Sequence, residues 1–356
     1  MKHKEIFICL VLITVLVPSI VWGAIELKFC NFFPIPARQS KIGEEFTKDL
    51  EARSRGQLKI TYFPAGTLLT APKIYDGVFE GIADIGLSHI GYNFGRFRMT
   101  EALNLPLGFP NAWVANHVAN DFYRQFKPKE WDKIHMLSMH AAPAQVVLSA
   151  TKPVYKMEDL KGMTLRSLGF VSEVVSALGA TPRPIPMPEA YEALQKRVID
   201  ALMIPMETLR AFRLAEVTKY VTECWAIGQV DAFYLVMNKD SWNKLPPDIQ
   251  KIFNEYPFEE KFTAMWNEID IDGKKYGMEK GLQFIELPSA EITKWKKAVE
   301  PVLDTYVKKM VASGYNEKET RELINYARMQ IEYWTKKQKE VGVKSSTGPS
   351  ELRVKW

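Results

Sequence analysis

The side chains that could perform catalysis are few and widely separated. Downstream of residue 23 the chain holds four histidines, His89, His117, His135 and His140, and no two of them have the spacing of a metal site. The sequence contains no H-E-x-x-H helix, no C-x-x-C pair and no glycine-rich phosphate loop. Residues 86–90 (GLSHI) come nearest to a nucleophile elbow but lack its second glycine. We therefore expect no catalytic residues, no metal and no cofactor.

The elements that would position any site alternate between strand and helix. Short apolar or alternating runs predict strands at 25–33, 58–63, 83–88, 146–149, 163–166, 198–203 and 232–238. Helical spacing of apolar residues predicts helices at 40–53, 172–178 and 188–196, and mostly amphipathic helices from about residue 247 onward. Strands that alternate with helices indicate parallel sheets covered on both faces. The fold class is therefore predicted to be α/β.

The strand predicted at 232–238 lies far in sequence from its expected neighbours in the first α/β unit. A chain that builds one unit, then a second, and then returns must cross between lobes more than once. Such crossings form a hinge, and the space between the lobes is the expected ligand site.

The first 23 residues have the features of a secretory signal peptide. Lys2 and Lys4 precede an apolar run from Ile6 to Trp22, and small residues follow. The run is shorter than the roughly 20 residues of a spanning helix, although an uncleaved anchor is the alternative. We expect export to the periplasm and cleavage near Gly23 or Ala24.

Composition excludes several classes of protein. Of 356 residues, 47% are hydrophobic and 25% charged, which is typical of a globular chain. The 47 Lys and Arg residues nearly balance 42 Asp and Glu residues, and the net charge of +5 is dispersed, so a nucleic-acid partner is not expected. Cys30 and Cys224 are too far apart to indicate a disulfide scaffold and are expected to be buried.

One series of motifs is much more specific as a set than any of its parts. Its members are, in order, 157–166 (MEDLKGMTLR), 177–182 (ALGATP), 186–195 (PMPEAYEALQ) and 198–201 (VIDA). Further segments agree with it, namely 62–68 (YFPAGTL), 81–86 (GIADIG), 105–109 (LPLGF) and 242–250 (WNKLPPDIQ). The series resembles the extracytoplasmic solute-binding proteins of tripartite ATP-independent periplasmic (TRAP) transporters, of the dicarboxylate-type (DctP-type) family.

This resemblance implies a two-lobed fold like that of type II periplasmic binding proteins, with hinge crossings and a helical C-terminal region. It also implies a long helix that links the lobes, which Pro257 is expected to kink or break. On that basis we expect lobe I at 24–143 and 230–270, and lobe II at 144–229 and 271–335. Residues 336–356 are expected to form a tail, mobile from Val341 onward.

The resemblance also implies that an arginine holds the carboxylate of an organic acid, and Arg166 occupies the matching position. A guanidinium offers two parallel donors to a carboxylate and stays charged when desolvated. An inter-lobe or surface salt bridge is the alternative role of Arg166.

The remaining candidate pocket residues are less polar than in sialic-acid-binding members of the family. We expect Phe170 and Trp225 to stack on a flat ligand, although a hinge-core role suits Trp225 equally. Polar groups available for orientation are Tyr92, His89, His140, Gln145 and Glu207. The other positions expected in the pocket are Phe32, Met187 and Ile204.

We therefore predict a monomeric receptor that captures an apolar or aromatic monocarboxylate, an oxo acid or a hydroxy acid. As the resemblance implies, it would deliver the ligand to a TRAP membrane permease. A receptor for a C4-dicarboxylate is one alternative, and a secreted enzyme with His89 or His140 as the base is another.

Overall fold

Two β-sheets organise the chain, which the computed structural model describes from residue 23 to residue 356. The sheet of lobe I has the order β2-β1-β3-β10-β4 and consists of β1 (Ile25–Asn31), β2 (Leu58–Phe63), β3 (Ile85–His89), β4 (Ile134–Ala141) and β10 (Ala232–Asn238). The sheet of lobe II has the order β11-β9-β5-β8-β6-β7 and consists of β5 (Val146–Ser149), β6 (Thr164–Arg166), β7 (Thr181–Arg183), β8 (Ala201–Ile204), β9 (Tyr220–Glu223) and β11 (Gln283–Glu286). The predicted two-lobed α/β fold is confirmed.

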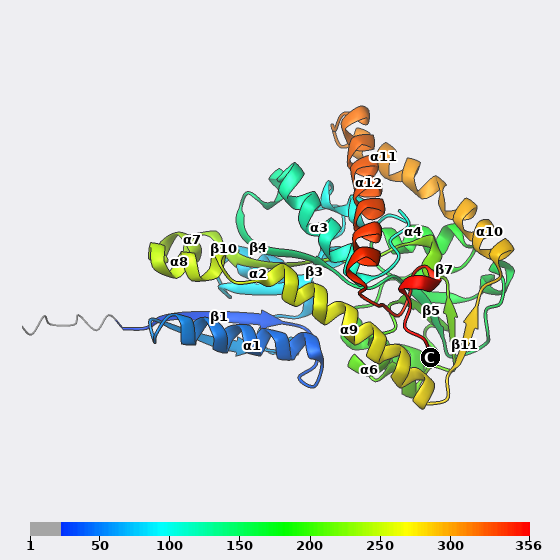
Figure 1. The fold of residues 1–356 in the computed structure, drawn as a ribbon, viewed down its shortest axis with the longest axis horizontal. Helices are drawn as coiled ribbons and strands as arrows, with labels where there is room; N and C mark the ends of the chain where they lie inside the picture. Colours follow the sequence, from blue (N-terminus) through cyan, green and yellow to red (C-terminus); the bar gives the residue numbers. More distant parts are fainter. Residues whose placement is uncertain (1–22) are drawn as a thin grey trace, which may run out of the picture.

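Helices cover both sheets, and Figure 1 shows how they are distributed between the lobes. Helices of the first half of the chain are α1 (Arg38–Arg53), α2 (Ile74–Phe79), α3 (Ala112–Phe126), α4 (Phe170–Ala177) and α5 (Ala190–Gln195). Those of the second half are α6 (Thr208–Ala211), α7 (Lys239–Lys244), α8 (Pro247–Asn254), α9 (Phe258–Glu279), α10 (Ser289–Val299), α11 (Pro301–Ala312) and α12 (Glu317–Val341). None of the helices in this described part combines the length and apolar character needed to cross a bilayer. The predicted signal peptide lies almost wholly outside the described residues.

Both sheets are mixed, so the prediction of parallel sheets is wrong. In lobe I, β10 runs antiparallel to β3 and β4, and in lobe II, β5 runs antiparallel to β8 and β9. The reason lies in the crossings. A strand that enters a sheet directly from the other lobe must run away from the hinge, whereas β1 and β3 run towards it.

The chain crosses between the lobes at 142–145 and again at 224–231, and these two segments pair with each other. The amide of Ala142 donates to the carbonyl of Asp231 at 2.9 Å, and the amide of Gln145 donates to the carbonyl of Gln229 at 3.0 Å. Helix α9, yellow in Figure 1, makes a third connection because it leads from lobe I to β11. As expected, the helical segment is broken before Pro257, between α8 and α9.

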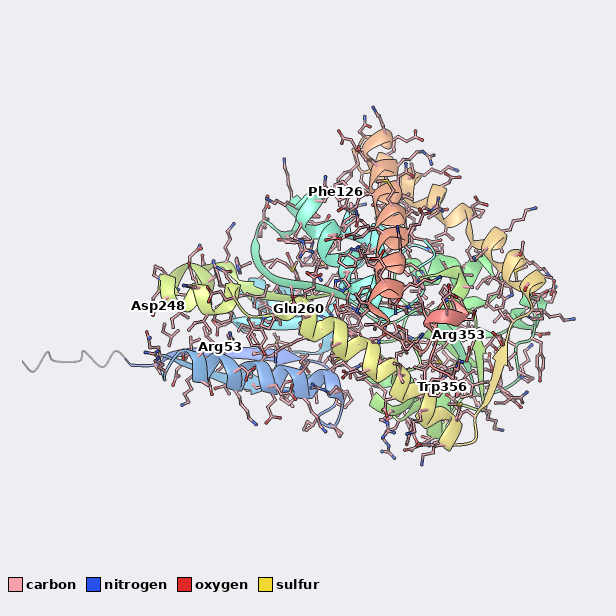
Figure 2. All side chains as sticks on the ribbon, viewed as in Figure 1. Arg53, Phe126, Asp248, Glu260, Arg353 and Trp356 are labelled. Atoms are coloured by element: carbon pink, nitrogen blue, oxygen red, sulfur yellow. The ribbon has the colours of Figure 1, made fainter. Side chains whose placement is uncertain are left out.

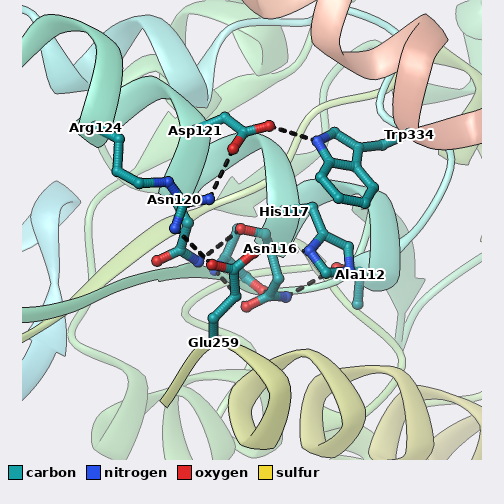
Figure 3. A network of polar contacts seen from close by, with 9 residues as sticks. Ala112, Asn116, His117, Asn120, Asp121, Arg124, Glu259 and Trp334 are labelled. Carbon is teal, nitrogen blue, oxygen red and sulfur yellow. Dashed lines mark hydrogen bonds and ion pairs between the residues drawn. The ribbon is translucent and has the colours of Figure 1, made fainter. Parts of the chain in front are cut away.

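The predicted range of lobe II, 271–335, placed all the C-terminal helices in that lobe. The structure places one of them, α12, against lobe I. Helix α12 packs along α3 of lobe I, where Trp334 Nε1 donates to Asp121 at 2.6 Å and its ring stacks on His117 at 4.0 Å (Figure 3). His117 and Arg124 also hold Glu259 at the start of α9, at 2.8 and 2.7 Å. The amphipathic pattern of α12 indicates a buried face but does not identify the lobe that covers it.

The expected tail is also different from the prediction. Residues 336–341 continue α12, and the segment beyond them is buried, with Ser345, Ser346 and Thr347 each at most 1% exposed. Ser345 Oγ donates to Asn267 of α9 at 2.5 Å, and Thr347 Oγ1 donates to the carbonyl of Pro110 in lobe I at 2.7 Å. The prediction of a mobile tail is therefore wrong.

The end of this segment reaches lobe II. Arg353 pairs with Glu286 of β11 at 3.2 Å, and Lys274 of α9 lies 5.5 Å from the centre of the Trp356 ring. Figure 2 shows Arg353 and Trp356 on the side of the molecule where α9 ends. The segment 343–356 thus contacts both lobes and the helix that connects them. Cys30 and Cys224 are buried and unpaired, as expected.

Truncating the chain after Gly342 should therefore destabilise it. The truncation leaves the polar groups of Asn267, Asp270 and Gln338 without buried partners, at about 1–3 kcal/mol for each unsatisfied group. We expect urea unfolding at a midpoint well below that of the full chain. A control chain that ends at Val354 should keep the full midpoint, and equal midpoints for all three chains would contradict the packing described here.

A second prediction concerns the hinge, where Gly228 and Gly108 are in backbone contact. A Cβ on Gly228 would lie 2.1 Å from the Cα of Gly108, and the φ of Gly228 is +65°. Gly95 also has a positive φ, +83°, but has open space around it. We expect Gly95→Ala to cost about 1 kcal/mol from backbone strain alone, and Gly228→Ala to cost more than about 3 kcal/mol. Chemical denaturation measures both, and similar losses would show that the contact is unimportant.

Candidate functional site

The ends of several strands meet between the two lobes. In lobe I the parallel strands β1 and β3 end beside Phe32 and at His89, and in lobe II the parallel strands β6 and β8 end at Arg166 and Ile204. In α/β proteins ligands bind outside the carboxyl ends of the strands. Because these ends face one another across the hinge, residues far apart in sequence line one space.

That space is a small cavity of about 30 Å³. Seven of the eleven candidate site residues line it, which are Phe32, His89, Tyr92, Arg166, Met187, Ile204 and Glu207. The other lining residues are Phe33, Ala142, Pro205, Thr208, Phe212, Asp231 and Phe233. Its wall is mostly apolar and aromatic, with a few polar groups, as is common in sites for small organic molecules.

Arg166 is the strongest feature of the cavity. Its side chain is 4% exposed, and its Nε donates to the carbonyl of Ile185 at 2.9 Å. Within the described chain no carboxylate lies within ion-pair distance of the guanidinium, which is unusual because buried charges in proteins are normally paired. Burial lowers the pKa of Arg166, while Tyr92 and Asp231 raise it, and the group remains charged at neutral pH.

Tyr92 connects the two lobes at the cavity. Its hydroxyl accepts a hydrogen bond from the amide of Met187 in lobe II at 3.1 Å, and its ring meets that of Phe32 edge-on at 5.4 Å. Burial raises the pKa of this phenol, so it is neutral and free to donate its proton into the cavity.

Asp231 stands at the hinge crossing, directly before β10. Its Oδ1 lies 3.1 Å from Nε2 of His89, and its Oδ2 accepts a hydrogen bond from Nε2 of Gln145 at 2.6 Å. Gln145 therefore supports Asp231 from behind and does not line the cavity. Sequence reasoning missed Asp231, although its place immediately before the returning strand was a usable signal.

Glu207 brings a second carboxyl group to the cavity. It is 5% exposed, and its Oε2 accepts a hydrogen bond from Nε2 of Gln39 in α1 at 2.8 Å. Burial raises the pKa of Glu207 to about 8, and the carboxylate of Asp270 adds to the shift. At neutral pH this group is mostly protonated.

Aromatic rings form the apolar wall. Phe33 stacks on Phe32 with ring centres 4.4 Å apart, and lies 6.0 Å from Phe233. Sequence reasoning missed Phe33, Phe212 and Phe233, because their apolar character is equally compatible with a core position.

Phe170 and Trp225, expected to stack on the ligand, do not line the cavity. Phe170 begins α4 and packs against Phe94 and Tyr306, with ring centres at 5.2 and 5.4 Å. Trp225 lies in the crossing before β10, outside the cavity. The prediction for Phe170 rested on its closeness to Arg166 in sequence, and that for Trp225 rested on its place at the lobe crossing. The side-chain direction is set by the helical turns that begin at these two residues.

His140 also lies outside the cavity and belongs to the core. Its ring stacks on Phe262 at 4.0 Å, and its Nδ1 accepts a hydrogen bond from Trp266 Nε1 at 2.8 Å. Burial lowers its pKa to about 3, so it stays neutral. In the described part of the chain no group of three or more potential ligands could hold a metal ion.

Two hinged α/β lobes around a buried, unpaired guanidinium define a solute-binding receptor, and comparison with known proteins specifies its family. The profile of "bacterial extracellular solute-binding protein, family 7" (DctP) matches residues 37–310. The chain therefore belongs to this family, whose members are periplasmic receptors that bind small organic acids and work with the membrane components of TRAP transporters.

Named relatives agree with this assignment. The chain is 26% identical over 271 residues to a solute-binding protein of Albidiferax ferrireducens, covering 72% of this chain and 78% of the relative. It is 25% identical over 244 residues to the 2,3-diketo-L-gulonate-binding periplasmic protein YiaO of Escherichia coli, covering 65% and 73%.

Solved structures of the same kind superpose on both lobes. A TRAP periplasmic solute-binding protein of Desulfovibrio salexigens has a TM-score of 0.74 at 29% identity and covers 86% of this chain and 96% of its own. A TRAP solute-binding protein of Rhodoferax ferrireducens in complex with benzoate has a TM-score of 0.82 at 24% identity, covering 88% and 99%, and this likeness shows the fold.

A stability measurement tests whether Arg166 has a structural partner. Since the guanidinium has no carboxylate to pair with in the described chain, Arg166→Met should change the free energy of unfolding by no more than about 1 kcal/mol. The matched control is Lys274→Met, which breaks the buried pair between Lys274 and Glu223 at 2.5 Å and should cost about 3–5 kcal/mol. An equally large loss in both variants would mean that Arg166 holds the fold together.

Proposed function

We propose that Arg166 holds the carboxylate of a small organic monocarboxylate, which the receptor then delivers to a TRAP permease. The observation that carries this proposal is a guanidinium that is almost fully buried, lines the cavity and has no anionic partner in the described chain. A ligand carboxylate supplies that partner, and charge-assisted hydrogen bonds contribute roughly 1.5–3 kcal/mol each.

The wall of the cavity favours an apolar body on the acid. Phe32, Phe33 and Phe233 line it together with Met187 and Ile204, and these side chains cannot hydrogen-bond to the hydroxyl groups of a sugar acid. An apolar cavity that accepts benzene measures about 150 Å³, far more than the 30 Å³ found here. Both a short aliphatic acid and an aromatic acid therefore require the lobes to move apart, and the aromatic acid requires the larger movement.

The electrostatics of the cavity argue against a C4-dicarboxylate. A second ligand carboxylate would join the carboxylate of Asp231 in a space with one permanent cation, Arg166. Like charges in a desolvated site disfavour one another strongly. We therefore keep the monocarboxylate as the proposed ligand.

An enzymatic role has little support in the site. His140 is a neutral core residue, which leaves His89, paired with Asp231, as a possible base. Two hydroxyl groups share the lining with it. That of Thr208 already donates to the carbonyl of Pro205 at 2.7 Å, and that of Tyr92 accepts from the amide of Met187 at 3.1 Å. We propose that the chain binds and releases its ligand unchanged, as a monomer exported after cleavage near Gly23 or Ala24.

Thermal denaturation with a panel of acids tests the proposal. Because a ligand that binds only the folded state stabilises it, a matching monocarboxylate at 100 times its Kd should raise the melting temperature by about 4 °C. Propionate, isovalerate and phenylacetate form the core of the panel, and their neutral amides serve as controls. Arg166→Met should abolish the shift.

Two outcomes would contradict the proposal. Equal shifts with an acid and its amide would remove the guanidinium from ligand binding. Conversion of any acid to a product, followed by mass spectrometry, would indicate an enzyme.

A further inference from the structure

We propose that Glu207 is a specificity-determining residue that, in its neutral form, donates a hydrogen bond to a hydroxyl or oxo oxygen beside the ligand carboxylate. The inference rests on the proposed function and narrows its ligand to hydroxy or oxo monocarboxylic acids. The small cavity supports this position of the oxygen, because a ligand of few atoms held at Arg166 has its polar substituents close to the carboxylate.

The position of Glu207 supports a role towards the ligand. It precedes α6, directly after the turn that follows β8, and lines the same cavity as Arg166. Two hydrogen bonds hold the turn in place. The backbone amide of Glu207 donates to Asp270 of α9 at 3.2 Å, and Thr208 Oγ1 donates to the carbonyl of Pro205. Gly273 of α9 packs so closely here that a Cβ would lie 2.4 Å from the carbonyl oxygen of Met206.

The hydrogen bonds of Glu207 indicate which oxygen carries the proton. Its Oε2 already accepts from Gln39, while its Oε1 makes no hydrogen bond within the described chain. A proton on Oε1 is therefore available to an acceptor in the cavity. Gln39 itself is 1% exposed and cannot easily turn away.

The charges around Glu207 favour its neutral form. The titratable group that contacts its backbone from outside the cavity is Asp270, whose negative charge raises the pKa of Glu207 and whose own pKa is raised by burial to about 7. The cations of the neighbouring groove on the outer side are Arg38 and Lys41 from α1 and Arg210 from α6. Arg38 pairs with Glu45 at 3.0 Å and Arg210 pairs with Asp272 at 2.5 Å, so neither is committed to Glu207.

Within the cavity the other charged or titratable groups are Arg166, Tyr92, Asp231 and His89. The ligand carboxylate would neutralise Arg166, and Asp231 already has His89 and Gln145 as partners. Ionised Glu207 would then face a ligand anion with no free cation between them. Binding should therefore require the proton on Glu207.

This requirement makes ligand affinity depend on pH. Below a pH of about 8, where Glu207 is protonated before and after binding, affinity should not change through this group. Above that value the free receptor loses the proton and must take it up again on binding. Affinity should then fall, by up to about tenfold for each pH unit.

The test uses matched pairs of acids that differ by one oxygen, namely propionate with lactate and pyruvate, isovalerate with 2-oxoisovalerate, and phenylacetate with mandelate. Isothermal titration of the full chain from pH 7 to pH 9.5 gives each Kd. We expect the oxygenated member of a binding pair to bind about 3- to 10-fold more tightly at pH 7, and its affinity to fall above pH 8.

Three variants assign these effects. Glu207→Gln keeps a donor but cannot ionise, so it should bind within about threefold of the natural chain at pH 7 and show no loss of affinity up to pH 9.5. Glu207→Leu should lose the preference for the oxygenated acid. The control is Glu101→Gln, because burial also raises the pKa of Glu101 to about 7 although it lies outside the cavity, and this variant should retain both effects.

Each failure has a separate meaning. Acids that bind with no oxygen preference, or a pH profile that survives in Glu207→Gln, would overturn the role of Glu207 and leave Arg166 untouched. If none of the acids binds, the proposed function fails, and this inference fails with it. Should Glu207→Leu not fold, the pH profile of Glu207→Gln decides alone.

Discussion

A desolvated guanidinium without a counter-ion in the described chain is the constraint on which the site depends. Removing a cation from water costs free energy, and proteins normally offset that cost by pairing the cation with an anionic group. Here the end of β6 places Arg166 between the lobes, and only the carbonyl of Ile185 accepts from its Nε. A site of this kind attracts a carboxylate because the anion provides the missing interaction, and the surrounding aromatic rings keep water from competing for it.

Contacts elsewhere in the fold hold the two lobes in the relative position that forms this cavity. The crossings pair through backbone hydrogen bonds, Gly108 and Gly228 meet without side chains, and α9 passes both lobes. The segment 343–356 adds buried contacts to lobe I, to α9 and to lobe II. Closure around the ligand therefore involves a hinge in which backbone groups of the two crossings already pair with each other.

Sequence patterns located much of the site but failed where side-chain direction decided the outcome. The motif at 157–166 and the strand at 232–238 led to a two-lobed fold, and residues adjoining strand ends, such as Phe32, His89 and Ile204, do line the cavity. Phe170 was close to Arg166 in sequence, yet its ring packs against Phe94 and Tyr306. The antiparallel strands and the buried C-terminal segment also escaped prediction, because neither local propensity nor composition reports which lobe a segment will meet.

By itself the sequence determined the α/β fold class through its periodicity, and the order of its motifs identified the class of protein by resemblance, because both depend on residues close together along the chain. It also determined that an arginine ends a strand at position 166. Only the tertiary structure decided which titratable groups lie around this arginine and whether they are protonated. Burial in the walls of the cavity and the charge of Asp270 raise the pKa of Glu207, although the hydrogen bond from Gln39 lowers it, and Asp231 enters the site because β10 returns from the other lobe. Protonation depends on distance and desolvation in three dimensions, and segments far apart along the chain supply both.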